Sequence, residues 1–148
     1  MTEQNQFCTF YLDNHTFGVK VEQVQEVFRY QEMTKVPLAP PEVRGLINLR
    51  GQIITAIDLR LRLGMAPGPD DKLPMNVVVR TQDGVVSLLV DEIGDVLEAP
   101  DDVYERPPET IPMEVRNLVL GVYKLEGRLL LILDSEKAVN VSTGAVAT

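Results

Sequence analysis

Only one cysteine, Cys8, and one histidine, His15, occur among the 148 residues. A lone cysteine excludes an internal disulfide, and the two residues together are too few for a zinc site. Cys8 lies on the apolar face of a strand-like stretch, which predicts a buried and unreactive thiol. His15 lies in a turn-like stretch, which predicts a solvated loop residue. No set of residues for nucleophilic or metal-dependent catalysis emerges, which weighs against an enzyme.

Basic residues are in the minority, with 14 Lys and Arg against 22 Asp and Glu, and the formal net charge is −8. Such a charge repels phosphate backbones and anionic membranes. Aromatic residues, which form the stacking platforms of nucleic-acid-binding barrels, make up only 5% of the chain. We therefore expect no nucleic acid as a partner.

Long apolar runs are also missing. The longest, from Leu129 to Leu133, is far shorter than the roughly 20 residues that span a bilayer. The N-terminal stretch MTEQNQ is polar and lacks the basic and apolar regions of a signal peptide. We expect a cytoplasmic protein without direct membrane insertion.

The acidic clusters do not follow the pattern of a calcium-binding loop, which alternates oxygen ligands along the chain. These clusters are Asp70-Asp71, Asp91-Glu92-Asp95 and Asp101-Asp102. No glycine-rich segment opens a helix in the manner of a phosphate-binding loop. We interpret the acidic clusters as solvated faces or turns, and we expect neither a metal nor another cofactor.

Strand signals dominate what the sequence does contain. Alternating apolar residues predict a hairpin over residues 7–21, and three further hairpins with turns at Arg50-Gly51, Gln82-Asp83-Gly84 and Glu126-Gly127. The turn at Arg50-Gly51 places a glycine where a positive φ is needed. Apolar residues at helical spacing over 21–28 predict one or two turns of helix.

Capping residues and prolines mark the remaining segments. Asp58 is a predicted N-cap, with Gly64 following the short helix, and Asp134 or Ser135 caps a second helix. Residues 65–73 are rich in proline and aspartate, which predicts a linker, and residues 99–116 predict a long irregular connection.

An internal repeat organises these elements. Segment 45–58 matches segment 121–134 at a shift of 76 positions, and segment 21–27 matches segment 90–96 at a shift of 69. The alternative reading is a chance agreement of short apolar strands. Two copies of one all-β unit, each marginal alone, would form two packed five-stranded barrels. We place the halves at 7–64 and 74–140, joined by the linker 65–73, in a single domain over 1–148.

Positions that differ between the copies are free of the demands of the fold. Arg50 corresponds to Glu126, so the hairpin turn accepts either charge. We therefore expect the Arg50 side chain to be exposed and to serve a partner. The alternative is that Arg50 folds inward and anchors the barrel on Asp58.

Three segments resemble the CheW family of chemotaxis coupling proteins. VPLAPPEVRGLINLRGQIITAIDLR (36–60) is similar to the family's signature region. FGVKVEQVQEVF (17–28) and LLVDEIGDVLEAP (88–100) are similar to its other marked segments, in the family's order. The resemblance covers residues 7 to about 140, and it departs from the family at Thr55, where proline is common.

This resemblance implies two SH3-like five-stranded β-barrels in an all-β fold with short helices. It also implies a non-catalytic scaffold that couples the cytoplasmic tip of methyl-accepting chemoreceptors to the regulatory domain of the histidine kinase CheA. The alternatives are a coupling protein of another chemosensory system, such as twitching motility, and a fragment of a kinase regulatory domain. The start at Met1 and the lack of an ATP site favour a free-standing protein.

The resemblance further implies a partner-binding surface, with an apolar groove that receives a helix face. Val90 and Val96 join its candidate residues through the repeat alone. For the valines the alternative is core packing, and for the two charged residues it is an ordinary solvated surface. The candidates are Val24, Glu26, Val27, Gly45, Arg50, Val90 and Val96.

Overall fold

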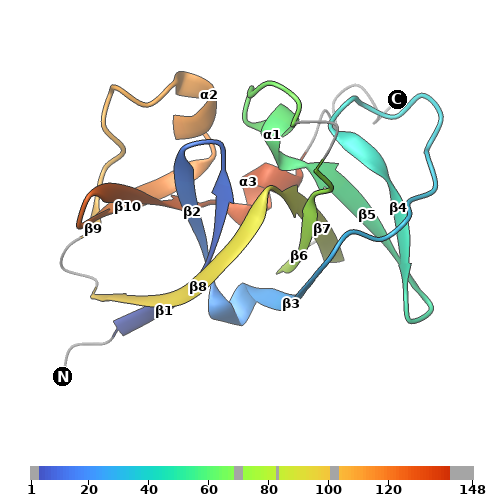
Figure 1. Ribbon diagram of the computed structural model, residues 1–148, viewed down its shortest axis with the longest axis horizontal. Helices are drawn as coiled ribbons and strands as arrows, with labels where there is room; N and C mark the ends of the chain where they lie inside the picture. Colours follow the sequence, from blue (N-terminus) through green and yellow to red (C-terminus); the bar gives the residue numbers. More distant parts are fainter. Residues whose placement is uncertain (1–3, 69–71, 83, 101–103, 141–148) are drawn as a thin grey trace.

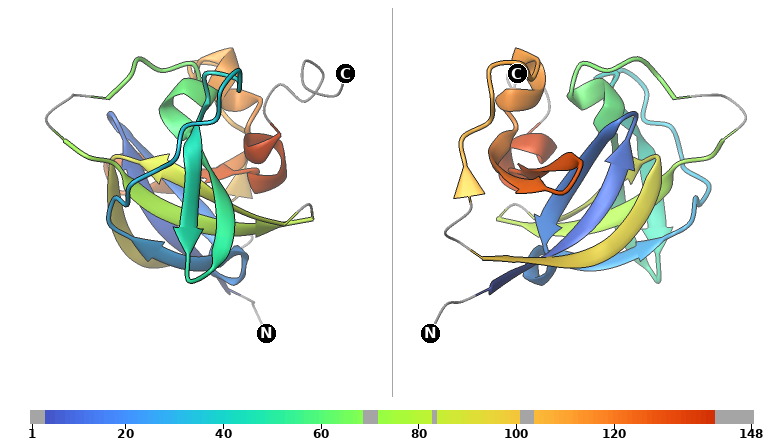
Figure 2. Two further views of the ribbon diagram at one scale, coloured as in Figure 1. Left: turned by 90° about the vertical axis from the view of Figure 1, so that its right-hand side faces the viewer. Right: turned by 60° about the vertical axis from the view of Figure 1, so that its left-hand side comes forward.

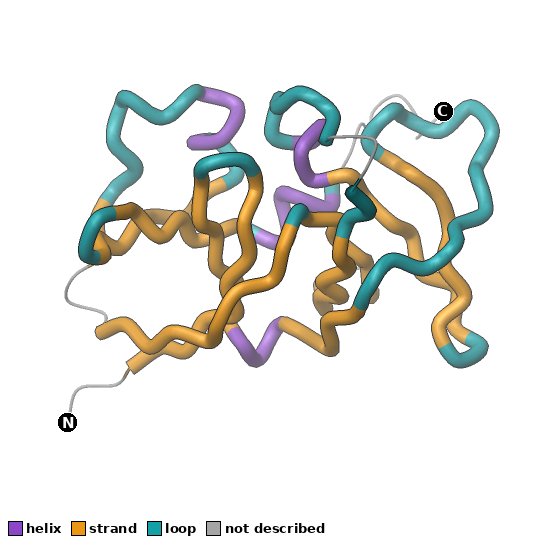
Figure 3. Tube along the Cα trace, in the orientation of Figure 1, coloured by secondary structure: helices purple, strands orange, loops and turns teal. Residues whose placement is uncertain are grey.

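The computed structural model describes residues 4–68, 72–82, 84–100 and 104–140. Two β-sheets dominate these ranges, with the short helices α1 and α2 at the top of the molecule and α3 near its middle (Figures 1 and 3). None of the helices in the described ranges is long and apolar enough to cross a membrane.

The larger sheet has six strands in the order β8-β1-β2-β11-β10-β9. Neighbouring strands pair antiparallel except β2 and β11, which run parallel. The strands are β1 (Gln4–Leu12), β2 (His15–Lys20), β8 (Glu92–Pro100), β9 (Tyr104–Glu105), β10 (Val119–Leu125) and β11 (Arg128–Leu133).

The smaller sheet has five strands in the order β3-β6-β7-β5-β4. Here β5 and β7 form the parallel pair, and the other neighbours are antiparallel. The strands are β3 (Val24–Phe28), β4 (Val43–Leu49), β5 (Gln52–Asp58), β6 (Met75–Thr81) and β7 (Gly84–Val90).

Short helices connect the strands. They are the 3-10 helix η1 (Val21–Gln23), α1 (Leu59–Arg62), α2 (Met113–Arg116) and α3 (Ser135–Val139). Asp58 caps α1 by accepting a hydrogen bond from the Leu61 N–H at 3.3 Å. Asp134 caps α3 in the same way through the Lys137 N–H at 3.2 Å. Both predicted caps are confirmed, and Asp134 rather than Ser135 is the second.

Two expectations about local structure need correction. Residues 21–28 form one 3-10 turn and then strand β3, because Val24 to Phe28 pair with β6 at the edge of the smaller sheet. The connection 99–116 is not wholly irregular, since it includes β9 and α2. The four predicted hairpins are present, although Asp83 lies outside the described residues.

The strand pairing supports the internal repeat. Strand β3 pairs with β6 as β8 pairs with β1, and β5 pairs with β7 as β11 pairs with β2. In the parallel pairs, Thr55 faces Val86 and Leu131 faces Phe17. These pairs are repeat mates, because Thr55 and Leu131 differ by 76 positions and Phe17 and Val86 by 69.

Each sheet, however, takes strands from both copies of the repeat. The smaller sheet combines β3, β4 and β5 of the first copy with β6 and β7 of the second. The larger sheet combines β1 and β2 of the first copy with the last four strands of the second. The division at the linker 65–73 is therefore a division between repeats and not between sheets, and residues 69–71 of that linker lie outside the described chain. Four strand pairs join one copy to the other: the parallel pairs β5–β7 and β2–β11 and the antiparallel pairs β3–β6 and β1–β8.

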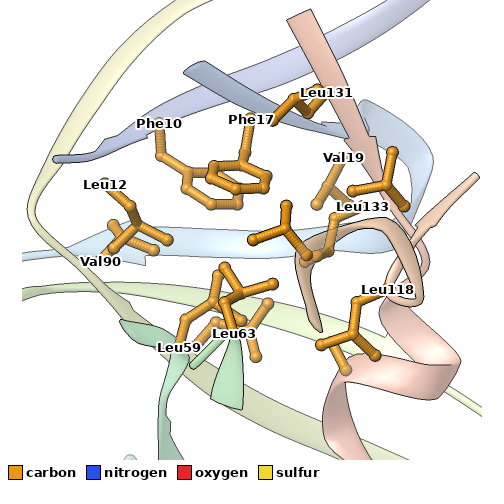
Figure 4. Packing of buried hydrophobic residues seen from close by; sticks show 14 of the residues in the cluster. Phe10, Leu12, Phe17, Val19, Leu59, Leu63, Val90, Leu118, Leu131 and Leu133 are labelled. Carbon is orange, nitrogen blue, oxygen red and sulfur yellow. The ribbon is translucent and has the colours of Figure 1, made fainter. Parts of the chain in front are cut away.

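One hydrophobic core joins the two sheets. Phe10 and Phe17 of the larger sheet stack with ring centroids 5.9 Å apart, and Val90 of the smaller sheet lies in the same cluster (Figure 4). Leu59 and Leu63 close this cluster from the α1 side. The larger sheet also has a small cluster around Tyr123, and the smaller sheet has two, one around Ile47 and one around Val78.

Candidate partner-binding surface

Arg50 occupies the tip of the β4–β5 hairpin, where it has a φ of 52° and the following Gly51 a φ of 87°. The Asn48 side-chain oxygen accepts a hydrogen bond from the Gly51 N–H at 2.9 Å and fixes this turn. The Arg50 side chain stays 70% exposed. The expected exposure of Arg50 at a tight turn is therefore confirmed.

Arg50 pairs with Glu26, another of the candidate residues. Glu26 lies on β3, one edge strand of the smaller sheet, and the β4–β5 hairpin forms the opposite edge. The ion pair thus connects the two edges, which lie close together at the lower side of the molecule (Figure 2, left). The alternative contact of Arg50 with Asp58 does not occur, because Asp58 lies at the far end of β5 from the turn; Arg44 pairs with Asp58 at 2.9 Å.

The two candidate valines of β3 have different environments. Val24 is half-buried and packs against the main core. Val27 is 42% exposed, although its backbone pairs with Val77 of β6. We call Glu26, Val27 and Arg50 the edge surface: Arg50 and Val27 are exposed, the Glu26 side chain is 25% exposed, and Val24 packs inward against the core.

Gly45 is buried and offers no surface to a partner. A Cβ atom at this position would lie 2.7 Å from the Thr34 carbonyl oxygen. Thr34 and Leu46 exchange two backbone hydrogen bonds of 2.9 and 2.8 Å, so the connection after β3 runs antiparallel beside β4 at this point. Gly45 is needed for this close approach.

The two candidates derived from the repeat alone also differ. Val90 is 1% exposed and belongs to the main core, so its side chain does not reach the surface (Figure 4). Val96, the repeat mate of Val27, is 55% exposed on β8, the edge strand of the other sheet. Val96 thus presents an apolar side chain at the position equivalent to Val27, away from the edge surface.

Several exposed apolar residues were not expected from the sequence, and two of them lie on or before the β4–β5 hairpin. Ile53 lies on β5 opposite Asn48 and is 60% exposed. Leu38 is fully exposed in a turn closed by the Ala39 N–H and the Val36 carbonyl, and its φ is 65°. A positive φ in leucine is uncommon. The sequence signal for this turn was the position of Leu38 between Pro37 and Pro40.

An ion network around Arg60 was also missed. The Arg60 Nε and Nη2 atoms lie 2.7 and 2.5 Å from the two carboxylate oxygens of Asp91, and Nη2 lies 2.7 Å from Asp13. Asp91 stands where the chain leaves β7 of one sheet and enters β8 of the other. The network therefore fixes α1, the β1–β2 turn and this crossover together.

The charge state of Asp91 follows from this network. Partial burial alone would raise the pKa of Asp91, but hydrogen bonds from Arg60 and from the Asp13 N–H, with the charges of Arg60 and Lys72, lower it overall. The prediction of a solvated acidic cluster is thus wrong for Asp91, whereas Glu92 and Asp95 are exposed. Asp70-Asp71 and Asp101-Asp102 lie outside the described residues.

Cys8 and His15, the two side chains considered for reactivity, are both half-buried. Burial raises the pKa of the Cys8 thiol, which is half-buried on β1. His15 begins β2 and is half-buried, with its ring 6.1 Å from Phe17, so it is not the solvated loop residue that was expected. No group of three potential metal ligands occurs within the described ranges. The edge surface instead offers a charge pair beside an exposed apolar side chain, which suits contact with another protein.

Known proteins are similar to this chain in both sequence and fold. The family model described as the CheW-like domain matches residues 6–142. The chemotaxis protein CheW of Bacillus subtilis is 30% identical over 85% of this chain and 81% of its own length. The crystal structure of the scaffolding protein TtCheW from Thermoanaerobacter tengcongensis superposes with a TM-score of 0.83 at 27% identity, covering 96% of this chain and 92% of that one.

A more distant relative is Protein PilI of Pseudomonas aeruginosa, which is 26% identical over 79% of this chain and 66% of its own length. The family match extends over both sheets, the edge surface and all three helices. The chain belongs to the CheW-like domain family.

Proposed function

We propose that this protein is a non-catalytic, cytoplasmic scaffold that couples methyl-accepting chemoreceptors to a CheA-type histidine kinase in chemotaxis. The CheW-like match over residues 6–142 carries this proposal. The fold of the scaffolding protein TtCheW, which this chain shares at a TM-score of 0.83, supports it.

The edge surface is the proposed contact with a partner. Val27 supplies an exposed apolar side chain, and the Arg50–Glu26 pair supplies charges of both signs beside it. A guanidinium can hold a carboxylate or carbonyl in a bidentate geometry. Val96, exposed at the equivalent position on β8, is proposed as a second contact point. Gly45 and Val90 are buried and are proposed to support the fold rather than to contact the partner.

Calorimetric titration tests the proposal. Purified protein is titrated separately with a kinase regulatory domain and with a receptor signalling fragment, without metal or nucleotide. We expect micromolar affinity for each, which corresponds to about −8 kcal/mol. Absence of heat with both cognate partners contradicts the scaffold function, and so does turnover of a small molecule.

Coupling in another chemosensory system is a second candidate function, favoured by the likeness to Protein PilI. The two functions differ in the receptors and the kinase that the scaffold binds. Co-purification from the native cell separates them, because the kinase recovered with this protein identifies the system.

A further inference from the structure

A polar pocket of about 630 Å³, which we call the helix pocket, lies among α1, α2 and α3. Figure 1 shows α1 and α2 at the top and α3 near the middle of the molecule, all above η1 and β3. The pocket is therefore separate from the edge surface. Its polar lining consists of Arg62, Glu114, Arg116, Asn117, Lys137 and Asn140.

The three cations of this pocket lack acidic partners. Within the described part of the chain, Arg62, Arg116 and Lys137 form no ion pair with any carboxylate. Glu114 is the one acid that lines the pocket, and its side-chain carbons lie against Gly64. Three cations with one acid form a local positive charge in a protein whose net charge is −8.

A second pocket, of about 460 Å³, shows that cations lining a pocket of this protein can pair with carboxylates. It is also lined by three cations, Arg44, Arg60 and Lys72. Each of them pairs with an aspartate or glutamate. The unpaired cations are thus a property of the helix pocket and not of every pocket on this surface.

The two arginines of the pocket differ in how the protein holds them. The Arg62 Nε donates to the Ala138 carbonyl at 3.1 Å and its Nη2 to the Lys137 carbonyl at 2.8 Å, which fixes the guanidinium at the end of α3. The Arg116 Nε is buried and has no hydrogen-bond acceptor among the described residues. A buried donor without an acceptor is unfavourable, and no described residue holds the Arg116 guanidinium through this atom.

The repeat shows that the fold does not require these charges. A shift of 76 positions relates Arg116 to Pro40, Lys137 to Leu61 and Ala138 to Arg62. The alignment holds here, because Asp58 and Asp134 donate equivalent backbone hydrogen bonds of 2.7 Å to Glu42 and Leu118. No cation of the helix pocket has a cation as its repeat mate.

We propose that the helix pocket binds a multivalent oxyanion, and that its ligand class is a small molecule carrying phosphoryl groups. Guanidinium groups donate paired hydrogen bonds to phosphoryl oxygens, and Asn117 and Asn140 add amide donors. The negative charge of the rest of the molecule repels anions, so binding depends on this local cluster. The site is independent of the proposed coupling function.

Inorganic pyrophosphate is the probe, titrated into the full-length protein by calorimetry, with sodium chloride at equal ionic strength as the reference. We expect saturable binding of one pyrophosphate per chain. Lys137→Gln and Arg116→Gln should each weaken it at least tenfold. Arg128→Gln, which removes an exposed cation from the distant β10–β11 hairpin, should leave it unchanged.

Thermal melts of each variant establish that it is folded. Lys137 is exposed, so Lys137→Gln keeps the test valid even if Arg116→Gln does not fold. Heat that matches the chloride reference overturns the proposal. Binding that survives in Lys137→Gln at full strength, or that is lost equally in Arg128→Gln, overturns it as well.

Discussion

At the scale of single residues, Arg50 is the exposed charge on which the proposed partner contact depends most. It pairs with Glu26 across two strand edges while remaining 70% exposed. An exposed ion pair contributes only about 0.2–1 kcal/mol to stability. Its repeat mate is Glu126, so the positive charge is not needed for the turn and is available for a partner.

We predict that Arg50→Glu weakens binding of the kinase domain or the receptor fragment by about 2 kcal/mol or more, as loss of an interfacial charge pair does. The free energy of unfolding should fall by no more than about 1 kcal/mol. Arg50→Lys should recover part of the binding. Calorimetry and thermal melts on the same samples measure both quantities.

Lys124→Glu is the matched control for this prediction. Lys124 is 72% exposed and pairs with Glu105 of the neighbouring strand β9 at 3.5 Å. Reversing its charge breaks a comparable pair on the other sheet and should not reduce binding in the same way. A large fall in melting temperature in Arg50→Glu alone would make Arg50 a structural residue.

The turn glycines give a second test at this scale. Gly51 and Gly127 have φ values of 87° and 79°, and no atom lies within 4 Å of a Cβ built on either. Valine would be strained by the backbone alone, so Gly51→Val and Gly127→Val should each destabilise by about 1–3 kcal/mol. Urea unfolding of both variants measures this. If only one is destabilised, the two hairpins are not equivalent.

At the scale of elements, the hairpins and the caps were predictable, whereas strand β3 was not. The hairpins have local signals, because glycine turns separate stretches of alternating residues. Val24 and Val27 fit helical spacing, and only the long-range pairing with β6 makes this segment a strand. The Arg60–Asp91 contact was equally hidden, because 31 positions separate the two residues.

The Arg60 network leads to a prediction about pH. The folded state lowers the pKa of Asp91, so its carboxylate stabilises the fold fully above the unfolded pKa of about 3.9. This contribution is lost as the pH falls through the lower folded pKa. Asp91→Asn should therefore cost about 1–3 kcal/mol at pH 7, and the difference from the unmodified protein should shrink below about pH 4.

Urea unfolding at a series of pH values measures this difference. Glu92→Gln is the control, because Glu92 is the next residue along the chain and forms an exposed pair with Lys72. We expect little change from it at any pH. A deficit in Asp91→Asn that is the same at pH 7 and in acid would mean that the Asp91 charge does not stabilise the fold.

At the scale of the whole molecule, the repeat predicted two similar copies but not their exchange of strands. Similarity between segments shows that β5 and β11 are equivalent, but it does not show which copy supplies their partners. The parallel pairs β5–β7 and β2–β11 settle this. The resemblance proposes Glu26, Val27 and Arg50 as partner-binding residues, and only the packing shows that the candidates Gly45 and Val90 are buried.

Bridging is the central claim about the whole molecule, and a three-component assembly measurement tests it most directly. A receptor signalling fragment is immobilised, and the kinase regulatory domain is passed over it with and without this protein. We predict that the kinase domain is retained only when this protein is present, and that Arg50→Glu reduces its retention while Lys124→Glu does not. Equal retention of the kinase domain with and without this protein would contradict the account.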